Sequence, residues 1–218
     1  MVQRSLVRVY RGFFGLLTLA AIVVQLAAAY GTPSFSPVNY FSYFTIDSNL
    51  IATAVFLITA ASGRQSRMLD LLRGAAVVYM TVVGVVFTLL LRGTDVDTAI
   101  PWVNTVVHEL MPMVMVADWL LDPPRERLSL SRGLFWLSFP LAWMIYTLVR
   151  GAITGRYPYP FLDPANGGYA SVAAYCVAIL VLLVVVCAVV VWLGNARSAT
   201  VGSAESRLAM TPTNRIER

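Results

Sequence analysis

Hydrophobic and polar positions fall into long blocks along this chain, without the short alternation of strands. Six blocks are almost entirely apolar, and a helix needs about 20 such residues to cross a bilayer. They cover about residues 12–30, 40–61, 71–91, 102–121, 134–149 and 170–193. The pattern predicts an all-α polytopic membrane protein, with a bundle of six transmembrane helices over residues 1–194. The polar segment 195–218 is expected to be a disordered cytoplasmic tail.

Prolines mark several of the predicted boundaries. Pro33 and Pro37 lie in the turn between the first two blocks, and Pro123 follows the fourth. Pro140 lies inside the fifth block, where it is expected to kink the helix. The first block has the basic start of a signal peptide. Because the block is long and five others follow, we expect a retained helix.

Composition agrees with a membrane protein. The chain is 58% hydrophobic and only 12% charged, whereas soluble domains carry about a quarter charged residues. A net charge of +5 raises the question of nucleic acid. The basic residues, all arginine, instead cluster at the ends of the apolar blocks, where they orient helices. We therefore expect membrane lipids as partners and no nucleic acid.

The arginines also predict the topology. Of 16 basic residues, 13 belong to the N-terminus, the loops near Arg64 and Arg125, and the tail. The opposite side holds only Arg92, Arg150 and Arg156. Cytoplasmic segments carry the excess of arginine. Both termini are therefore expected in the cytoplasm, and the protein in the plasma membrane.

Two polar stretches interrupt apolar blocks at one depth. His108, the only histidine, follows Asn104 by one helical turn, and Thr45, Ser48 and Asn49 share one face of the second helix. Counted from the outer ends of their helices, Thr45 lies roughly 8 Å and His108 roughly 9 Å below the surface. We expect the two polar faces to meet. An ionisable residue at membrane depth is a candidate for function.

This pairing favours nucleophilic catalysis. Thr45 would attack an ester carbonyl, with His108 as general base and then general acid. Asn49 and Asn104 are candidate donors to the oxyanion, and Ser48 is the competing nucleophile. Arg150 follows the fifth helix and is a candidate for substrate binding.

These stretches resemble a known family. Phe44-Thr45-x-x-Ser48-Asn49, His108 in the fourth helix, and the loop Tyr157-Pro-Tyr-Pro-Phe-Leu-Asp163 are similar to the androgen-induced membrane protein family and its bacterial six-helix relatives. The animal members are intramembrane threonine hydrolases that cleave fatty acid esters of hydroxy fatty acids. The resemblance implies that Thr45 is the nucleophile, that His108 is the essential histidine, and that a fatty acyl ester is the substrate.

Two other classes of function stay open. A small-molecule carrier would use Asp47 and Asp118, near opposite ends of their helices, although no internal repeat supports one. A non-catalytic scaffold or sensor would use the polar faces only to hold helices together. The sequence has no zinc-ligand spacing, phosphate loop or dinucleotide fingerprint, so neither a metal nor another cofactor is expected. Two interpretations of Tyr157, Tyr159 and Phe161 are open: they line a lipid entrance, or they hold the loop at the bilayer surface, as is typical of aromatic residues there. We favour the second.

Overall fold

The computed structural model describes residues 2–33, 35–62, 66–94 and 100–210. Arg64 of the first basic loop and residues 211–218 of the predicted tail lie outside these ranges. The described residues contain helices and no strand, which confirms the all-α prediction. The α-helices are α1 (Val2–Tyr30), α2 (Pro37–Tyr40), α3 (Phe44–Ser62), α4 (Arg67–Val86), α5 (Pro101–Thr105), α6 (Met111–Leu121), α7 (Leu130–Phe135), α8 (Ser138–Thr154) and α9 (Gly168–Met210).

Five helical segments of the described chain are long and apolar enough to cross a membrane. They are Ser5–Tyr30, Phe44–Ser62, Arg67–Leu91, Leu130–Thr154 and Gly168–Ser198. They match five of the six predicted blocks, so the prediction of a multi-pass membrane protein is confirmed at this coarser level. The last helix, α9, continues to Met210, well past the predicted boundary at residue 193.

The fourth predicted helix consists of three shorter pieces. The π-helical turn η2 (Val106–Leu110) joins α5 to α6. Pro112 explains the change, because it has no N–H to donate to the carbonyl of His108. In the turn before Pro112, the Met111 N–H donates to the Val106 carbonyl, five residues back, which is the π-helical spacing. A second π-helical turn, η1 (Phe87–Leu91), ends α4.

The fifth predicted helix is interrupted rather than kinked. A turn at Trp136 and Leu137 separates α7 from α8, so Pro140 lies in the first turn of α8, where no N–H is needed. A proline also frees the carbonyl four residues before it. That carbonyl, on Trp136, accepts a hydrogen bond of 2.8 Å from the Tyr79 hydroxyl.

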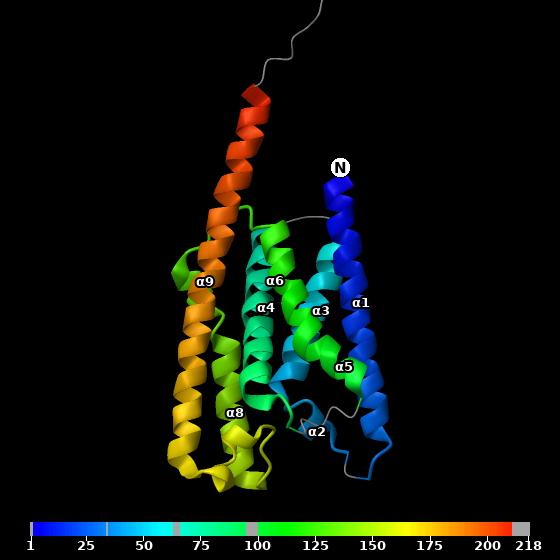
Figure 1. Ribbon diagram of the computed structural model, residues 1–218, viewed down its shortest axis with the longest axis vertical. Helices are drawn as coiled ribbons and strands as arrows, with labels where there is room; N and C mark the ends of the chain where they lie inside the picture. Colours follow the sequence, from blue (N-terminus) through cyan, green and yellow to red (C-terminus); the bar gives the residue numbers. More distant parts are fainter. Residues whose placement is uncertain (1, 34, 63–65, 95–99, 211–218) are drawn as a thin grey trace, which may run out of the picture.

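Helix α4 is the central helix of the bundle (Figure 1). It packs against α3, α6 and α9, and its residues Ala76, Val78 and Met80 have no exposed surface. The N-terminus and the far end of α9 lie at one end of the bundle. The short helix α2 and the loop 155–167, which contains the 3-10 turns η3 (Pro160–Leu162) and η4 (Pro164–Asn166), lie at the other end.

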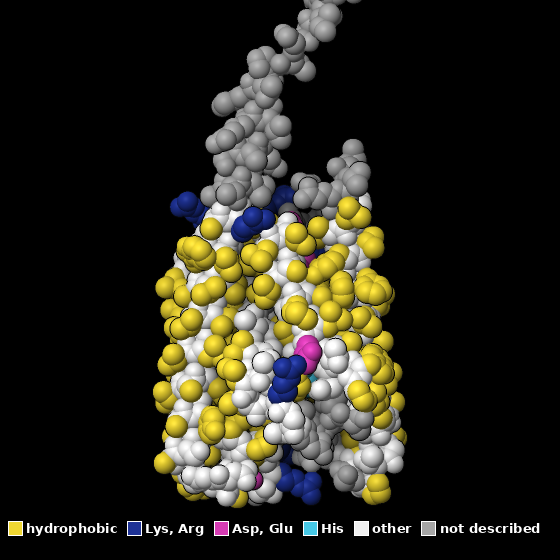
Figure 2. Space-filling model, viewed as in Figure 1, with side chains coloured by type: hydrophobic (Ala, Val, Ile, Leu, Met, Phe, Trp, Pro, Cys, Tyr) yellow, Lys and Arg dark blue, Asp and Glu magenta, His cyan; other side chains and the backbone are white. Residues whose placement is uncertain are grey.

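The surface of the bundle is largely apolar. In Figure 2, hydrophobic side chains cover most of the visible face, and most of the basic side chains lie toward the two ends. Exposed positions include Phe13 on α1, Ile145 on α8 and Val181 on α9, at 60%, 65% and 57% exposure. Such a belt is the surface that lipid chains cover.

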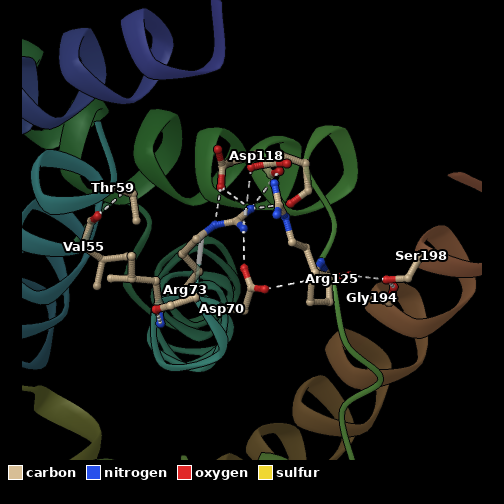
Figure 3. A network of polar contacts seen from close by, with 12 residues as sticks. Val55, Thr59, Asp70, Arg73, Asp118, Arg125, Gly194 and Ser198 are labelled. Atoms are coloured by element: carbon tan, nitrogen blue, oxygen red, sulfur yellow. Dashed lines mark hydrogen bonds and ion pairs between the residues drawn. The ribbon is translucent and has the colours of Figure 1, made fainter. Parts of the chain in front are cut away.

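A buried ion network joins three helices at the end that holds the N-terminus (Figure 3). Asp118 of α6 accepts from Arg11 Nε of α1 at 2.6 Å and from Arg73 Nη2 of α4 at 2.8 Å. Arg73 also donates to Asp70 at 3.0 Å, and Arg11 to Asp122 at 2.6 Å. Arg11, Arg73 and Asp118 are each at most 3% exposed. Arg11 and Arg73 lie near helix ends, where arginines orient helices, and they also join α1, α4 and α6 through ion pairs.

Candidate functional site

Thr45 lies in the first turn of α3 and is 6% exposed. Its backbone N–H donates to the Tyr159 hydroxyl at 3.3 Å, and its Oγ1 lies 3.3 Å from the same oxygen. Because the Tyr159 oxygen accepts from the backbone, its own proton is available for Thr45 Oγ1 or for a ligand. Thr45 thus presents a hydroxyl beside a second hydroxyl, both inside the bundle.

His108 lies in η2 and is 4% exposed. Its Nδ1 lies 3.3 Å from the Asn104 carbonyl oxygen, which can only accept, so Nδ1 carries the proton. In the neutral imidazole Nε2 is then the basic nitrogen. The ring stacks on Phe87 with centroids 4.3 Å apart and planes 17° apart. These contacts fix both the tautomer and the plane of the imidazole.

Both side chains line the same cavity. Thr45, His108 and Tyr159 share it with Tyr40 and Gln25. It measures about 40 Å³, which has room for water and not for a lipid chain. The hydrogen bonds described above connect Thr45 to Tyr159 and His108 to Asn104, and no direct bond between Thr45 and His108 is found among the described residues. Catalytic hydrogen bonds often form only when substrate is bound.

Thr45 also lines a second cavity, whose other lining residues are mostly apolar. It lies between α4, α8 and α9, and Val83, Trp143 and Leu183 are among its lining residues, together with Thr45 and Tyr159. Its volume is about 50 Å³. Thr45 therefore lies between the cavity that it shares with His108 and an apolar cavity that extends between membrane-spanning helices.

Asn49 holds the two polar stretches together. It has no exposed surface, and its Nδ2 donates to the Thr45 carbonyl at 2.8 Å and to the Val107 carbonyl at 3.0 Å. Both amide hydrogens are used by these two bonds. We therefore assign Asn49 to positioning α3 against η2, in place of the oxyanion role expected from its spacing.

The other candidate residues lie around the site without lining these cavities. Ser48 has no exposed surface, and its Oγ, like Oδ1 of Asn104, has no hydrogen-bond partner among the described residues. Asn104 acts through its backbone carbonyl, which orients His108. Arg150 donates to Asn39 and so ties the end of α8 to α2; its expected role in substrate binding stays a prediction.

The contact between the Tyr159 hydroxyl and Thr45 was not predicted from the sequence. Tyr159 was expected at the bilayer surface, but it is 5% exposed and packs against Tyr43 and Trp143. Burial raises the pKa of Tyr159 to about 12, and the hydrogen bonds from Thr45 oppose this rise. The phenol therefore keeps its proton at neutral pH and remains a hydrogen-bond donor.

Comparisons with known proteins give no assignment. A scan against protein-family models found no match, and searches of curated proteins and of solved structures found none either. The resemblance to the androgen-induced membrane protein family therefore stays a hypothesis.

Proposed function

We propose that this chain is an integral membrane hydrolase that cleaves carboxylic esters of lipids, with Thr45 as nucleophile and His108 as base. One observation carries the proposal: Thr45, His108 and Tyr159 line a single buried cavity. The Nδ1 contact of His108 supports it further, because it leaves Nε2 as the nitrogen that accepts a proton. The Asn104 carbonyl takes the orienting role that a carboxylate has in a catalytic triad.

The reaction proceeds in two balanced steps. His108 Nε2 takes the proton of Thr45 Oγ1 as that oxygen attacks the ester carbonyl, and the tetrahedral oxyanion accepts a hydrogen bond from the Tyr159 hydroxyl. The intermediate expels the alcohol oxygen, which takes the proton from His108, and the acyl group remains on Thr45. Water then attacks this ester with His108 again as base. The products are a carboxylic acid and an alcohol.

The apolar cavity supports a lipid substrate. Because it lies between α4, α8 and α9, an acyl chain would reach Thr45 directly from the bilayer. Its present volume of about 50 Å³ is smaller than the 300–1,000 Å³ of most small-molecule sites. Binding therefore requires side chains such as Met144 and Trp143 to move, together with the helices that carry them.

We also propose six membrane crossings, with α5, η2 and α6 forming the fourth, and both termini in the cytoplasm. The arginine distribution supports this orientation. The N-terminus and the far end of α9 lie at the same end of the bundle (Figure 1), which agrees with an even number of crossings. The site then lies in the outer leaflet of the plasma membrane.

Hydrolysis of fluorogenic acyl esters tests the proposed function. Purified wild type in detergent is expected to hydrolyse a medium-chain 4-methylumbelliferyl ester, and Thr45→Val is expected to lose about 10³-fold or more of kcat/KM. Thr45→Val keeps the β-branched shape and removes only the hydroxyl. Thr45→Ser is expected to retain activity, and Ser48→Ala to stay near wild type. A Thr45→Val protein as active as wild type would overturn the proposal.

Tyr159→Phe is expected to lower kcat about 100-fold while KM changes little. The substitution removes one donor to the oxyanion, and such donors are worth about 10²–10³ in kcat. The ring, and therefore the packing on Tyr43 and Trp143, is kept. Steady-state kinetics on the same ester measure the effect, and a change confined to KM would assign Tyr159 to binding alone.

A further inference from the structure

A polar cavity of about 210 Å³ lies beside the apolar one. Asp163 and Asn166 of the loop 155–167 line it, together with Ser171 and Tyr175 of α9. The loop lies at the end of the bundle opposite the N-terminus (Figure 1). This volume is below that of sites for drug-sized ligands, so the cavity suits a small polar group and not a second lipid chain.

Phe161 forms the wall between the polar and the apolar cavity, because it lines both. Its ring stacks on Tyr159 with centroids 5.3 Å apart and planes 3° apart, and it lies 5.6 Å from the ring of Tyr175. Tyr159 in turn contacts Thr45. A row of adjoining aromatic rings therefore leads from the polar cavity, along the apolar cavity, to Thr45. The rings are those of Tyr175, Phe161 and Tyr159.

Asp163 is the charged group of the polar cavity. Among the described residues that line it, no other carries a formal charge. The Ala165 N–H donates to Asp163 Oδ1 at 2.9 Å, which holds the carboxylate in place. Phe161 and Tyr175 line the cavity together with Asp163, so a cation there would meet both a carboxylate for ion pairing and aromatic rings for cation–π attraction. The N-terminus of α9 carries about half a positive charge, which the full charge of Asp163 outweighs.

We propose that this cavity binds the ammonium head group of the substrate. Resting on the proposed hydrolase function, this names the substrate class as fatty acyl esters of alcohols that carry an ammonium group. The acyl chain occupies the apolar cavity, the ester carbonyl lies at Thr45, and the alcohol portion extends past Phe161 to Asp163. Anionic head groups are excluded, because Asp163 repels them.

A matched pair of esters tests the inference. Palmitoylcholine and 3,3-dimethylbutyl palmitate have the same shape and differ in the charge of the head group. Wild type is expected to prefer palmitoylcholine in kcat/KM by about tenfold or more, which corresponds to one ion pair with partial burial. Asp163→Asn is expected to abolish this preference and to leave the neutral ester within about twofold. Asparagine keeps the acceptor for the Ala165 N–H, so the loop is preserved.

The control is Glu126→Gln, which also replaces an acid by its amide. Glu126 is exposed and pairs with Arg67, away from the polar cavity. This substitution is expected to change the hydrolysis of neither ester. Equal hydrolysis of both esters by wild type and by Asp163→Asn would overturn the ammonium site while leaving the hydrolase proposal intact.

Binding separates this inference from the proposed function. The Thr45→Val protein is expected to bind palmitoylcholine, measured by tryptophan fluorescence, and the added Asp163→Asn substitution is expected to weaken Kd about tenfold. A wild type that hydrolyses neither ester and no fluorogenic ester would contradict the proposed function. In that case an unchanged Kd in the double variant would also overturn the ammonium site, whereas a tenfold loss would support it as a binding site.

Discussion

His108→Gln is expected to lower kcat for ester hydrolysis by about 10³-fold, within the range for a general acid–base catalyst. Glutamine can donate from its amide to the Asn104 carbonyl, as His108 Nδ1 does. It offers no basic nitrogen to Thr45, however. Both formation and hydrolysis of the acyl-threonine should slow, since His108 takes a proton in each step.

The measurement is steady-state kinetics, with the thermal unfolding of each purified protein in the same detergent. His108 also stacks on Phe87, so a modest loss of stability is expected. Phe87→Leu serves as the control, because it loses the same stacking and keeps the imidazole. If Phe87→Leu loses as much activity as His108→Gln at similar stability, the histidine has a structural role and the base assignment is wrong.

Asp118→Ala is expected to lower the free energy of unfolding by about 3–5 kcal/mol, the usual cost of removing one partner from a buried ion pair. The variant leaves Arg73 and Arg11 buried without the carboxylate that they share. Asp70 and Asp122 keep only part of the network. Unfolding by sodium dodecyl sulfate in mixed micelles measures the change.

Arg67→Gln is the matched control for this prediction. Arg67 pairs with Glu126 at 3.3 Å, but the two side chains are 47% and 61% exposed. Exposed ion pairs contribute at most about 1 kcal/mol. A loss of less than about 1 kcal/mol in Asp118→Ala would contradict the view that the network joins α1, α4 and α6.

The position of most apolar helices could be predicted because a span is a local property of the sequence. Five of the six blocks appear as helices long enough to cross a membrane. The details that failed depend on prolines within the blocks. Pro140 restarts a helix at Ser138 where a kink was expected, and Pro112 accompanies a π-helical turn. Whether a proline kinks a helix or ends it depends on neighbours that accept the freed carbonyl, as Tyr79 does.

The ion network could not be predicted because its partners are distant in sequence. Arg11 and Asp118 are 107 residues apart, and an arginine near a helix end is normally an orientation signal. The position of Asp118 inside an apolar block indicated only that some buried partner was needed. An acid inside an apolar block needs a buried partner, and the arginines that lie within neighbouring helices were the available ones.

The candidate site was accessible to sequence reasoning only in part. Helical spacing indicated Thr45 and His108, and both line one cavity in the structure. The contact of Tyr159 with Thr45 and the positioning role of Asn49 were missed, because a loop has no periodicity and because hydrogen-bond partners follow from tertiary packing. The single loop residue Tyr159 adds a hydroxyl that no helical pattern predicts.

The identity of the residue that becomes covalently modified tests the central claim most directly. The purified protein would be treated with a lipophilic fluorophosphonate, digested, and mapped by mass spectrometry of the peptides. The proposed mechanism predicts a single adduct on Thr45 that is absent from His108→Gln. An adduct on Ser48 or on Tyr159, or no adduct on the folded wild-type protein, would contradict a threonine nucleophile activated by His108.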